Sequence, residues 1–457
     1  MAVPLSAEER FAIGQQRRKQ IRRTQHAVWK PKERRENPLK LLQRSMHGRI
    51  PALVALKYER MEASPFGYFR GAVPVMAYDL SLIGNTGICS QLCGDAHVRN
   101  LGAYAAPDGR IVFDINDFDE TISSPFEWDV KRMAVSLILA GREAGASDKN
   151  CREATTVFLK QYRRLMADFA RMPVLEVARF QVHRLQKIPA VEKILEMAGK
   201  TAAKETVREL TTANKKWGSE RQHQTTAHAN KSVTPGRTFK TIPPDLKRLI
   251  GVEAGRVTDS LTKYAESLSP ERRIFFLQYK TVDVAFKVVG TGSVGLRDYC
   301  IYMVGNGPKD PMFLQIKEEV QSGYAPYLQR QRSKANRPPA FHQGRRVVEG
   351  ARRMQLQSDP FLGWTTMGGR DYLVRQLNDN KASVQLKDLN QAGLVEYACV
   401  CGELLARGHA RSGDSSMLAG YLGVSGTFAD AVTRFAEAYA DQTERDWKEL
   451  VRSRKRR

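Results

Sequence analysis

The sequence lacks any uninterrupted apolar run of about 18 residues, the shortest length that spans a bilayer as a helix. Its opening residues, 1–23, are polar and basic and contain no apolar segment of the kind found in secretory signals. Only six cysteines occur in 457 residues, and none forms a CxxC pair, which argues against a disulfide framework or a paired-cysteine metal site. These absences predict a soluble, cytoplasmic protein with reduced thiols.

Acidic residues are also scarce relative to basic ones. The chain has 73 Lys and Arg against 49 Asp and Glu, a formal net charge of +24, with basic runs at 17–23, 30–35 and 452–457. Such a charge attracts anionic partners, although a solvated surface with basic termini explains it more simply. Aromatic residues make up only 8% of the chain and none interleave with the basic runs, so the sequence contains no recognisable nucleic-acid-binding module.

The length exceeds what one hydrophobic core usually supports, so we expect two lobes in a helix-rich α+β fold. Four regions differ in composition: a basic N-terminal arm at 1–45, a region at 46–243 that ends in a polar insertion at 200–243, a region at 244–390, and a helical region at 391–457. Helical spacing of apolar residues predicts helices at 126–145, 151–170, 391–411 and 427–450. Short β-branched segments at 283–289, 298–304, 312–317 and 371–377 predict an antiparallel sheet.

One polar cluster has the composition of a metal-assisted phosphoryl-transfer site. Asp95 is followed five positions later by Asn100, and Asp114 ends the apolar strand that comes next. This spacing matches the loop in which an aspartate acts as catalytic base while an asparagine and a second aspartate bind Mg²⁺. Asp117, which precedes Phe118, is a second candidate for the metal-binding aspartate. A polar turn with Asx caps is the structural alternative.

A second candidate motif is the glycine run Gly290, Gly292 and Gly295. A dinucleotide-binding fold needs a helix directly after such glycines, but residues 296–304 favour a strand, so a glycine hairpin over phosphates fits better. Lys317 ends the following alternating strand and is the expected phosphate-binding lysine. Glu349, on a helix predicted at 345–357, is a candidate partner for that lysine, or else an ordinary surface glutamate.

Several long segments resemble the bacterial family catalogued as domain of unknown function 2252. The resemblance covers nearly the whole chain and lies in SPFGYFRGA (64–72), CGDAHVRNLGAY (93–104), VFDINDFDET (112–121), FEWDVKRMAVSL (126–137), VVGTGSVGLR (288–297), LQIKEE (314–319), RRVVEGARRMQ (345–355) and GHARSGD (408–414).

A finer resemblance is to the aminoglycoside phosphotransferase-like kinases, whose site has the form HGDxHxxN followed by an apolar strand and a helix that opens with an aspartate. It implies that Asp95 is the base, that Asn100 and Asp114 bind magnesium, and that Asp129 braces the loop. His97 matches the second histidine of the motif, whereas Cys93 replaces the first. These kinases place the glycine loop before the catalytic loop, so the resemblance implies a circularly permuted, two-lobed kinase-like fold.

The resemblance makes 46–243 the catalytic-loop region, 244–390 the nucleotide-binding region, and ATP with Mg²⁺ the cofactors. The acceptor remains open, as do two other functions: a non-catalytic nucleotide-binding regulator, and a nucleic-acid-binding protein that uses a metal for phosphodiester cleavage. Arg70 and Arg375 could bind an anionic substrate, although structural ion pairs are the simpler interpretation. His409 and Asp414 could form a further polar pair, or cap the end of a helix.

Overall fold

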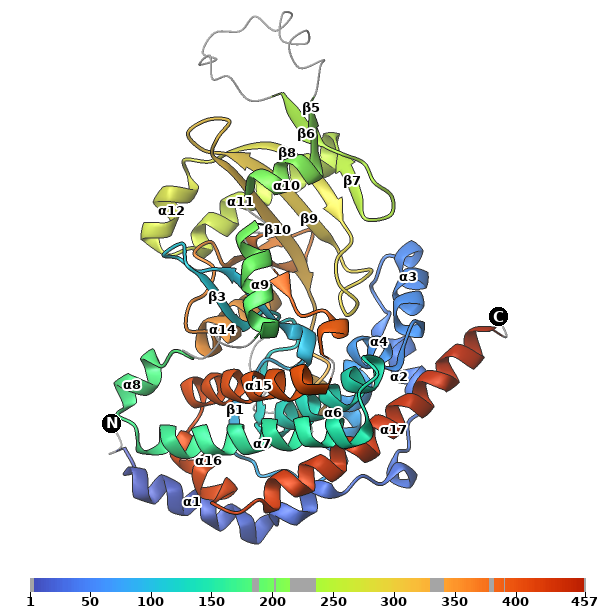
Figure 1. Ribbon diagram of the computed structural model, residues 1–457. Coiled ribbons are helices and arrows are strands. Elements are labelled where there is room, and N and C mark those ends of the chain that lie inside the picture. Colours follow the sequence, from blue (N-terminus) through green and yellow to red (C-terminus); the bar gives the residue numbers. More distant parts are fainter. Residues whose placement is uncertain are drawn as a thin grey trace, which may run out of the picture.

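An antiparallel sheet and a layer of helices form the two halves of the fold, drawn at the top and bottom of Figure 1. The computed structural model describes residues 4–182, 189–200, 203–213, 236–328, 341–377, 382–389 and 391–455. Within these ranges no helix has the length and apolar character needed to cross a membrane.

The main sheet has six strands, and each pair of neighbours is antiparallel. Its order is β11 (Gly363–Met367), β12 (Arg370–Gln376), β10 (Pro311–Glu319), β9 (Asp298–Val304), β8 (Lys280–Lys287) and β7 (Leu246–Leu249).

Successive side chains of each strand lie on opposite faces of the sheet. Apolar side chains such as Ile301, Leu314 and Ile316 form a core with α11 (Gly251–Ser267) and α12 (Pro270–Phe276). Lys317 has the opposite parity on β10 and pairs in register with Asp298 on β9, so both face the helical half. A third helix, α14 (Gln343–Met354), packs against β12, β11 and β10.

The helical layer is built around α6 (Glu127–Glu143), in which every side chain from Glu127 to Gly141 is buried. A helix that is covered on all sides must lie inside the layer. The helices that pack against α6 include α7 (Asp148–Arg171), α15 (Gln391–Ser412) and α17 (Thr427–Lys455). In addition, α16 (Ser415–Leu422) packs against α7, and α1 (Ala7–Gln20) packs against α16. The close approach of α1 to α16 requires small residues, because a Cβ at Gly14 or Gly420 would collide with the facing backbone.

The remaining elements are shorter, and their strands form small sheets apart from the main one. The strand pairs are β1 (Cys89–Leu92) with β4 (Ile122–Pro125), β2 (Leu101–Ala105) with β3 (Ile111–Ile115) and β13 (Ala382–Ser383), and β5 (Thr211–Ala213) with β6 (Arg237–Phe239). The remaining α-helices are α2 (Pro38–Ser45), α3 (Pro51–Glu62), α4 (Pro65–Gly71), α5 (Val73–Ser81), α8 (Val174–Arg179), α9 (Pro189–Lys200), α10 (Ala203–Leu210) and α13 (Ala325–Leu328). Single 3₁₀ turns are η1 (Arg23–Ala27), η2 (Pro31–Glu33), η3 (Val98–Asn100) and η8 (Leu386–Asp388).

The mixed, helix-rich α+β class and the antiparallel sheet expected from the sequence are confirmed. The helix expected at 345–357 ends earlier, at Met354, because Gln355 is extended with φ −73° and ψ 143°. Residues 4–45, expected as a basic arm, pack on the helical layer, where Arg34 forms buried ion pairs with Asp79 and Asp446. Much of the polar insertion expected at 200–243 lies outside the described residues.

Candidate active site

The loop after β1 carries Asp95, and Asp129 at the start of α6 holds its backbone. The carboxylate of Asp129 is fully buried and accepts hydrogen bonds from the amides of Cys93 at 2.8 Å and Gly94 at 3.0 Å. The amino-terminal turn of a helix favours a negative charge, which helps this carboxylate to remain buried. Gly94 has φ +85°, and a Cβ there would collide with the Glu120 carbonyl oxygen. Asp129 therefore braces the loop that carries Asp95.

A buried arginine on α6 fixes the side chain of Asp95. Arg132 donates to the Asp95 carboxylate through Nε at 2.8 Å and Nη2 at 2.6 Å, and His97 Nε2 lies 3.5 Å from the other oxygen. Burial raises the pKa of Asp95, but the charge of Arg132, with His97, outweighs burial and holds the pKa well below its ordinary value. Asp95 is therefore a carboxylate at neutral pH, suited to orienting a hydroxyl group rather than to storing a proton.

Asn100 joins the Asp95 loop to the segment after β3. Its Nδ2 donates to the backbone oxygens of Asp95 and Asp117, both at 2.9 Å, and its Oδ1 accepts from the Asp117 amide at 2.6 Å. The Asn100 side chain thus fixes the distance between the Asp95 loop and the Asp117 segment. Its oxygen retains a second lone pair that could serve a metal ion.

The two candidate metal-binding aspartates lie in different environments. Asp114 is buried on β3 and forms an ion pair with Arg407 of α15, and it is absent from the lining of the cavity that contains Asp95 and Asn100. Asp117 lines that cavity, with 45% of its side chain exposed. The structure therefore brings Asp117, and not Asp114, together with Asp95 and Asn100. Asp119, not singled out from the sequence, also lines the cavity.

Lys317 of β10 pairs with these aspartates rather than with Glu349. Its Nζ forms an ion pair with Asp119 and lies 4.0 Å from Asp117, residues about two hundred positions earlier in the chain. Glu349 instead pairs with Arg345 and Arg353 on its own helix.

The contact from α14 to the site is made by an arginine. Arg346 donates to the backbone oxygens of Asp119 at 2.8 Å, Thr121 at 2.7 Å and Val320 at 2.8 Å. The sequence predicted that this helix contributes Glu349 to the site. The residue that makes the contact is Arg346, which lies one turn earlier on the same face of the helix.

The acidic pair beside Lys317 is electrostatically asymmetric. Burial and the neighbouring charge of Asp117 raise the pKa of Asp119 to about 6. The pKa of Asp117 is below its ordinary value, because the charge of Lys317 outweighs burial. A second buried carboxylate, Asp298, accepts from Gln315 Nε2 at 2.6 Å, and burial raises its pKa to about 7.

The glycine loop between β8 and β9 forms the opposite wall of the cavity. Gly290 and Gly295 have φ +73° and +90°, conformations that favour glycine. Basic side chains from the amino-terminal segment bind the carbonyl groups of this loop. Lys57 donates to Thr291 O at 3.0 Å and Gly292 O at 2.6 Å, and Arg49 donates to Val294 O at 2.6 Å. Neither contact was expected from the sequence, which shows only that these residues are basic.

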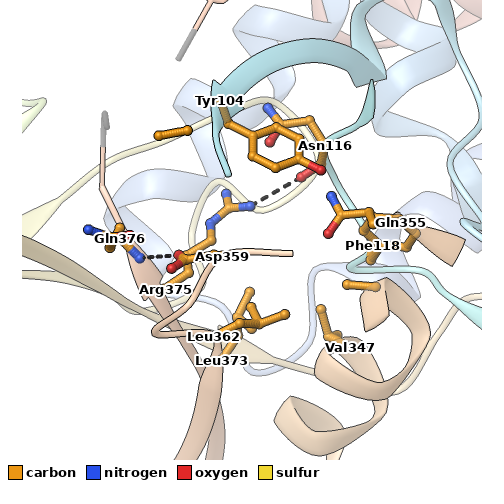
Figure 2. Close-up of a pocket in the computed structure, with 12 residues that line it drawn as sticks. Tyr104, Asn116, Phe118, Val347, Gln355, Asp359, Leu362, Leu373, Arg375 and Gln376 are labelled. Atoms are coloured by element: carbon orange, nitrogen blue, oxygen red, sulfur yellow. Dashed lines mark hydrogen bonds between the residues drawn. The ribbon is translucent and has the colours of Figure 1, made fainter. Parts of the chain in front are cut away.

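The two walls enclose a cavity of about 160 Å³ that is lined by Asp95, Asn100, Asp117, Asp119, Gly290 and Gly292, among others. A smaller cavity of about 40 Å³ lies beside it and shares Asn116 and Arg375. Figure 2 shows Arg375 reaching from β12 toward Asn116, whose carbonyl oxygen accepts its hydrogen bond at 3.2 Å. Arg375 therefore connects the sheet to the segment that follows β3.

The cavity lining contains oxygen atoms of the kind that bind magnesium. Among the described residues there is no group of three or more His, Cys, Asp or Glu side chains arranged to hold a metal ion. Mg²⁺, however, is usually bound through one or two carboxylates together with substrate phosphates. Asp119 Oδ1 and Glu319 Oε1 are buried and lack a hydrogen-bond partner, so they are unsatisfied acceptors in the cavity lining. This donor set fits a magnesium ion shared with a phosphate ligand.

The other predicted polar pair does not form. His409 is buried in α15 and contacts Asp129 at 3.4 Å and the hydroxyl group of Tyr162 at 2.8 Å. Asp414 caps α16 and forms an ion pair with Arg10. His409 therefore supports Asp129 from behind, and Asp414 has a structural role elsewhere.

Comparison with known proteins identifies a family but no activity. No curated protein and no solved structure matches the chain. Residues 49–453 match the family described as "Uncharacterized protein conserved in bacteria (DUF2252)". This match covers most of the chain and all of the cavity residues named above. The chain therefore belongs to the DUF2252 family.

Proposed function

We propose that the protein is a kinase-like phosphotransferase that transfers the γ-phosphate of ATP to a hydroxyl acceptor with the help of Mg²⁺. The observation that carries the proposal is the ion pair between Lys317 and Asp119, an aspartate that lines the same cavity as Asp95 and the glycine loop. It joins a glycine loop and its strand lysine to an aspartate and asparagine loop, although the two segments are far apart in sequence. These are the parts that phosphoryl transfer requires.

Each part has a role in the proposed reaction. Asp95 orients the acceptor hydroxyl, whose oxygen forms a bond to the γ-phosphorus as the bond from that phosphorus to the bridging oxygen of ADP breaks. The hydroxyl proton passes to Asp95 or to solvent. Lys317 and the glycine loop hold the nucleotide phosphates, while Asn100, Asp117 and Asp119 would hold Mg²⁺, which supplies charge neutralisation at those phosphates.

The proposal includes a circularly permuted kinase-like arrangement. The order of elements from β8 through the glycine loop, β9, β10, α14, β11 and β12 to α15 is the order of a nucleotide lobe followed by the first helix of a catalytic lobe. The Asp95 loop, which would follow that helix in an unpermuted chain, comes earlier in this one. Support for the arrangement comes from α15, which packs against α7, α6 and β1, the strand that leads into the Asp95 loop.

Calorimetry with Mg-ATP tests the donor, and the variant Asp95→Ala tests the chemistry. We expect the purified protein to bind Mg-ATP, and Asp95→Ala to lose phosphoryl transfer while retaining nucleotide affinity, because Asp95 contacts the acceptor rather than ATP. Absence of binding at millimolar Mg-ATP would rule out the nucleotide site. Equal ATP turnover in the variant and the native protein would remove Asp95 from the mechanism.

A further inference from the structure

Two arginines in the cavity lining lack the partners that the other charged residues have. Arg70 lies in the last turn of α4 and Arg99 lies on η3, and both are half-buried in the wall of the cavity. Neither guanidinium forms a hydrogen bond or an ion pair with any described residue, and Arg70 Nε is buried without a partner. A buried donor normally has an acceptor, so these groups indicate a missing ligand.

The other cations of the same lining are already engaged. Lys57 and Arg49 donate to carbonyl groups of the glycine loop, and Arg375 donates to Gln315 Oε1 at 2.9 Å and to the Asn116 carbonyl oxygen. Arg70 and Arg99 are therefore the cations of this lining that remain available to a ligand.

The two arginines line the same cavity as Asp95 and are connected to it through the loop and through Arg132. Arg132 donates to both Asp95 and the Phe69 carbonyl oxygen, at 3.0 Å for the latter, and so fixes the end of α4 beside the Asp95 carboxylate. Arg99 follows four positions after Asp95 on the same loop. Lys317, by contrast, is held by Asp119 on the nucleotide side of the cavity.

The electrostatics of the pair favour an anion. Burial lowers the pKa of Arg70 and the positive charge of Arg99 lowers it further, whereas the charges of Asp95, Asp117 and Glu143 act in the opposite direction. None of these carboxylates forms an ion pair with either arginine in the described part of the chain, so a ligand that brings a counter-charge into contact would stabilise the two like charges in this partly desolvated wall. Guanidinium groups bind the oxygens of phosphate and carboxylate in a bidentate manner, so a ligand of that chemistry would satisfy both side chains.

We propose that Arg70 and Arg99 form an anion subsite for the acceptor, which is therefore a hydroxyl compound that carries a phosphate or carboxylate group. This inference rests on the proposed phosphotransferase function, because it assigns the acceptor side of the same cavity. The arginines could bind either the γ-phosphate of the nucleotide or an anionic group of the acceptor, because the two groups have the same chemistry. Only in the second case does the site still bind phosphate when the nucleotide is already bound.

The test is a calorimetric titration of inorganic phosphate into the full chain saturated with the non-hydrolysable analogue Mg-AMP-PNP, in a buffer without other oxyanions. The variants are Arg70→Gln and Arg99→Gln, with Arg70→Lys as a version that keeps the charge. Arg256→Gln is the matched control, since it removes an exposed positive charge on α11, far from the cavity lining. Circular dichroism and thermal unfolding establish that each variant is folded.

We expect saturable phosphate binding in the native protein and in Arg256→Gln, and affinity weaker by about tenfold or more in each Gln variant, as expected for loss of a charge-assisted contact. Arg70→Lys should lose less. Unchanged phosphate affinity in both Gln variants would overturn the subsite.

Lack of phosphate binding once AMP-PNP is bound would also overturn the subsite. If AMP-PNP affinity then fell in the Gln variants while ADP affinity did not, the arginines would be assigned to the donor γ-phosphate. If AMP-PNP does not bind at all, the proposed function fails, and the same phosphate titration on the nucleotide-free protein still decides whether the subsite exists.

Discussion

Replacement of Arg132 by Met tests the contribution of the positive charge that holds Asp95, because it removes this charge and keeps most of the side-chain volume in the core. The Arg132 side chain is fully buried and donates to Asp95 twice and to the Phe69 carbonyl oxygen once. Methionine is long, flexible and apolar, so it occupies most of the same space without a positive charge. The variant therefore leaves a buried carboxylate and a carbonyl oxygen without their donor.

The expected loss of stability follows from this geometry. Removing one partner of a buried ion pair typically costs about 3–5 kcal/mol, because the remaining charge is uncompensated. Asp95 keeps 17% of its side chain exposed to the cavity, so water can partly replace the guanidinium. We therefore expect a loss of about 3 kcal/mol in the free energy of unfolding at pH 7, the lower end of that range.

The loss should also depend on pH. Burial raises the pKa of Asp95 and Arg132 more than compensates, so the folded-state pKa lies below the unfolded value. A depressed pKa stabilises the fold above the unfolded pKa of about 3.9, and the stabilisation fades as the pH falls through the folded value. Without Arg132 the carboxylate protonates more easily, so the difference between variant and native protein should shrink as the pH falls below about 5.

Urea unfolding of four proteins measures these quantities: the native chain, Arg132→Met, Asp95→Asn and the double variant. We expect Arg132→Met to be less harmful in the Asp95→Asn background, because no unpaired carboxylate is then left behind. A loss below about 1 kcal/mol for Arg132→Met, or equal losses in the two backgrounds, would refute the ion pair as the element that holds Asp95.

Three further predictions concern the loop and the sheet. Asp129→Asn leaves one oxygen to accept from two loop amides, so it should reduce the free energy of unfolding by about 1–3 kcal/mol in urea; an unchanged midpoint would contradict the bracing role. Gly94→Ala should destabilise by more than about 3 kcal/mol because of its collision with Glu120, whereas Gly109→Ala, also at positive φ but with open space around it, should lose only about 1 kcal/mol. Equal losses for the two glycine variants would show that backbone strain alone is responsible. Burial raises the pKa of Asp298 in the folded state to about 7. Between the pKa of Asp298 in the unfolded chain and pH 7, the folded state therefore binds a proton that the unfolded state has lost. The free energy of unfolding falls as the pH rises through this range. Asp298→Asn should therefore unfold at higher urea than the native protein at about pH 8 and show a smaller gain at about pH 5, and a pH-independent difference would contradict this.

Local patterns predicted the elements well because each pattern is complete within a short segment. The apolar spacing after Phe126 predicted α6 and α7, and the alternating residues that end at Lys317 predicted β10. The spacing from Asp95 to Asn100 likewise predicted a loop, which the structure places between β1 and β2. Periodicity depends only on neighbours in the chain, so it survives without knowledge of the fold.

Side-chain direction was less predictable. Asp114 was expected at the metal site, but β3 directs it toward Arg407, and the cavity is lined by Asp117 and Asp119 instead. Several aspartates within six residues are equally suited by composition. Which of them reaches a ligand depends on the turn after β3 and on the arginine that α15 supplies from far along the chain.

Residue spacing within single segments was enough to predict the α+β class, the positions of the main helices and strands, and the two polar motifs. The three-dimensional packing was needed to show that these motifs line one cavity, that Lys317 pairs with Asp119 rather than Glu349, and that Arg70 and Arg99 have no partner among the described residues. Burial, pairing and charge compensation depend on contacts between segments that are distant in sequence, whereas periodicity and turn chemistry are local.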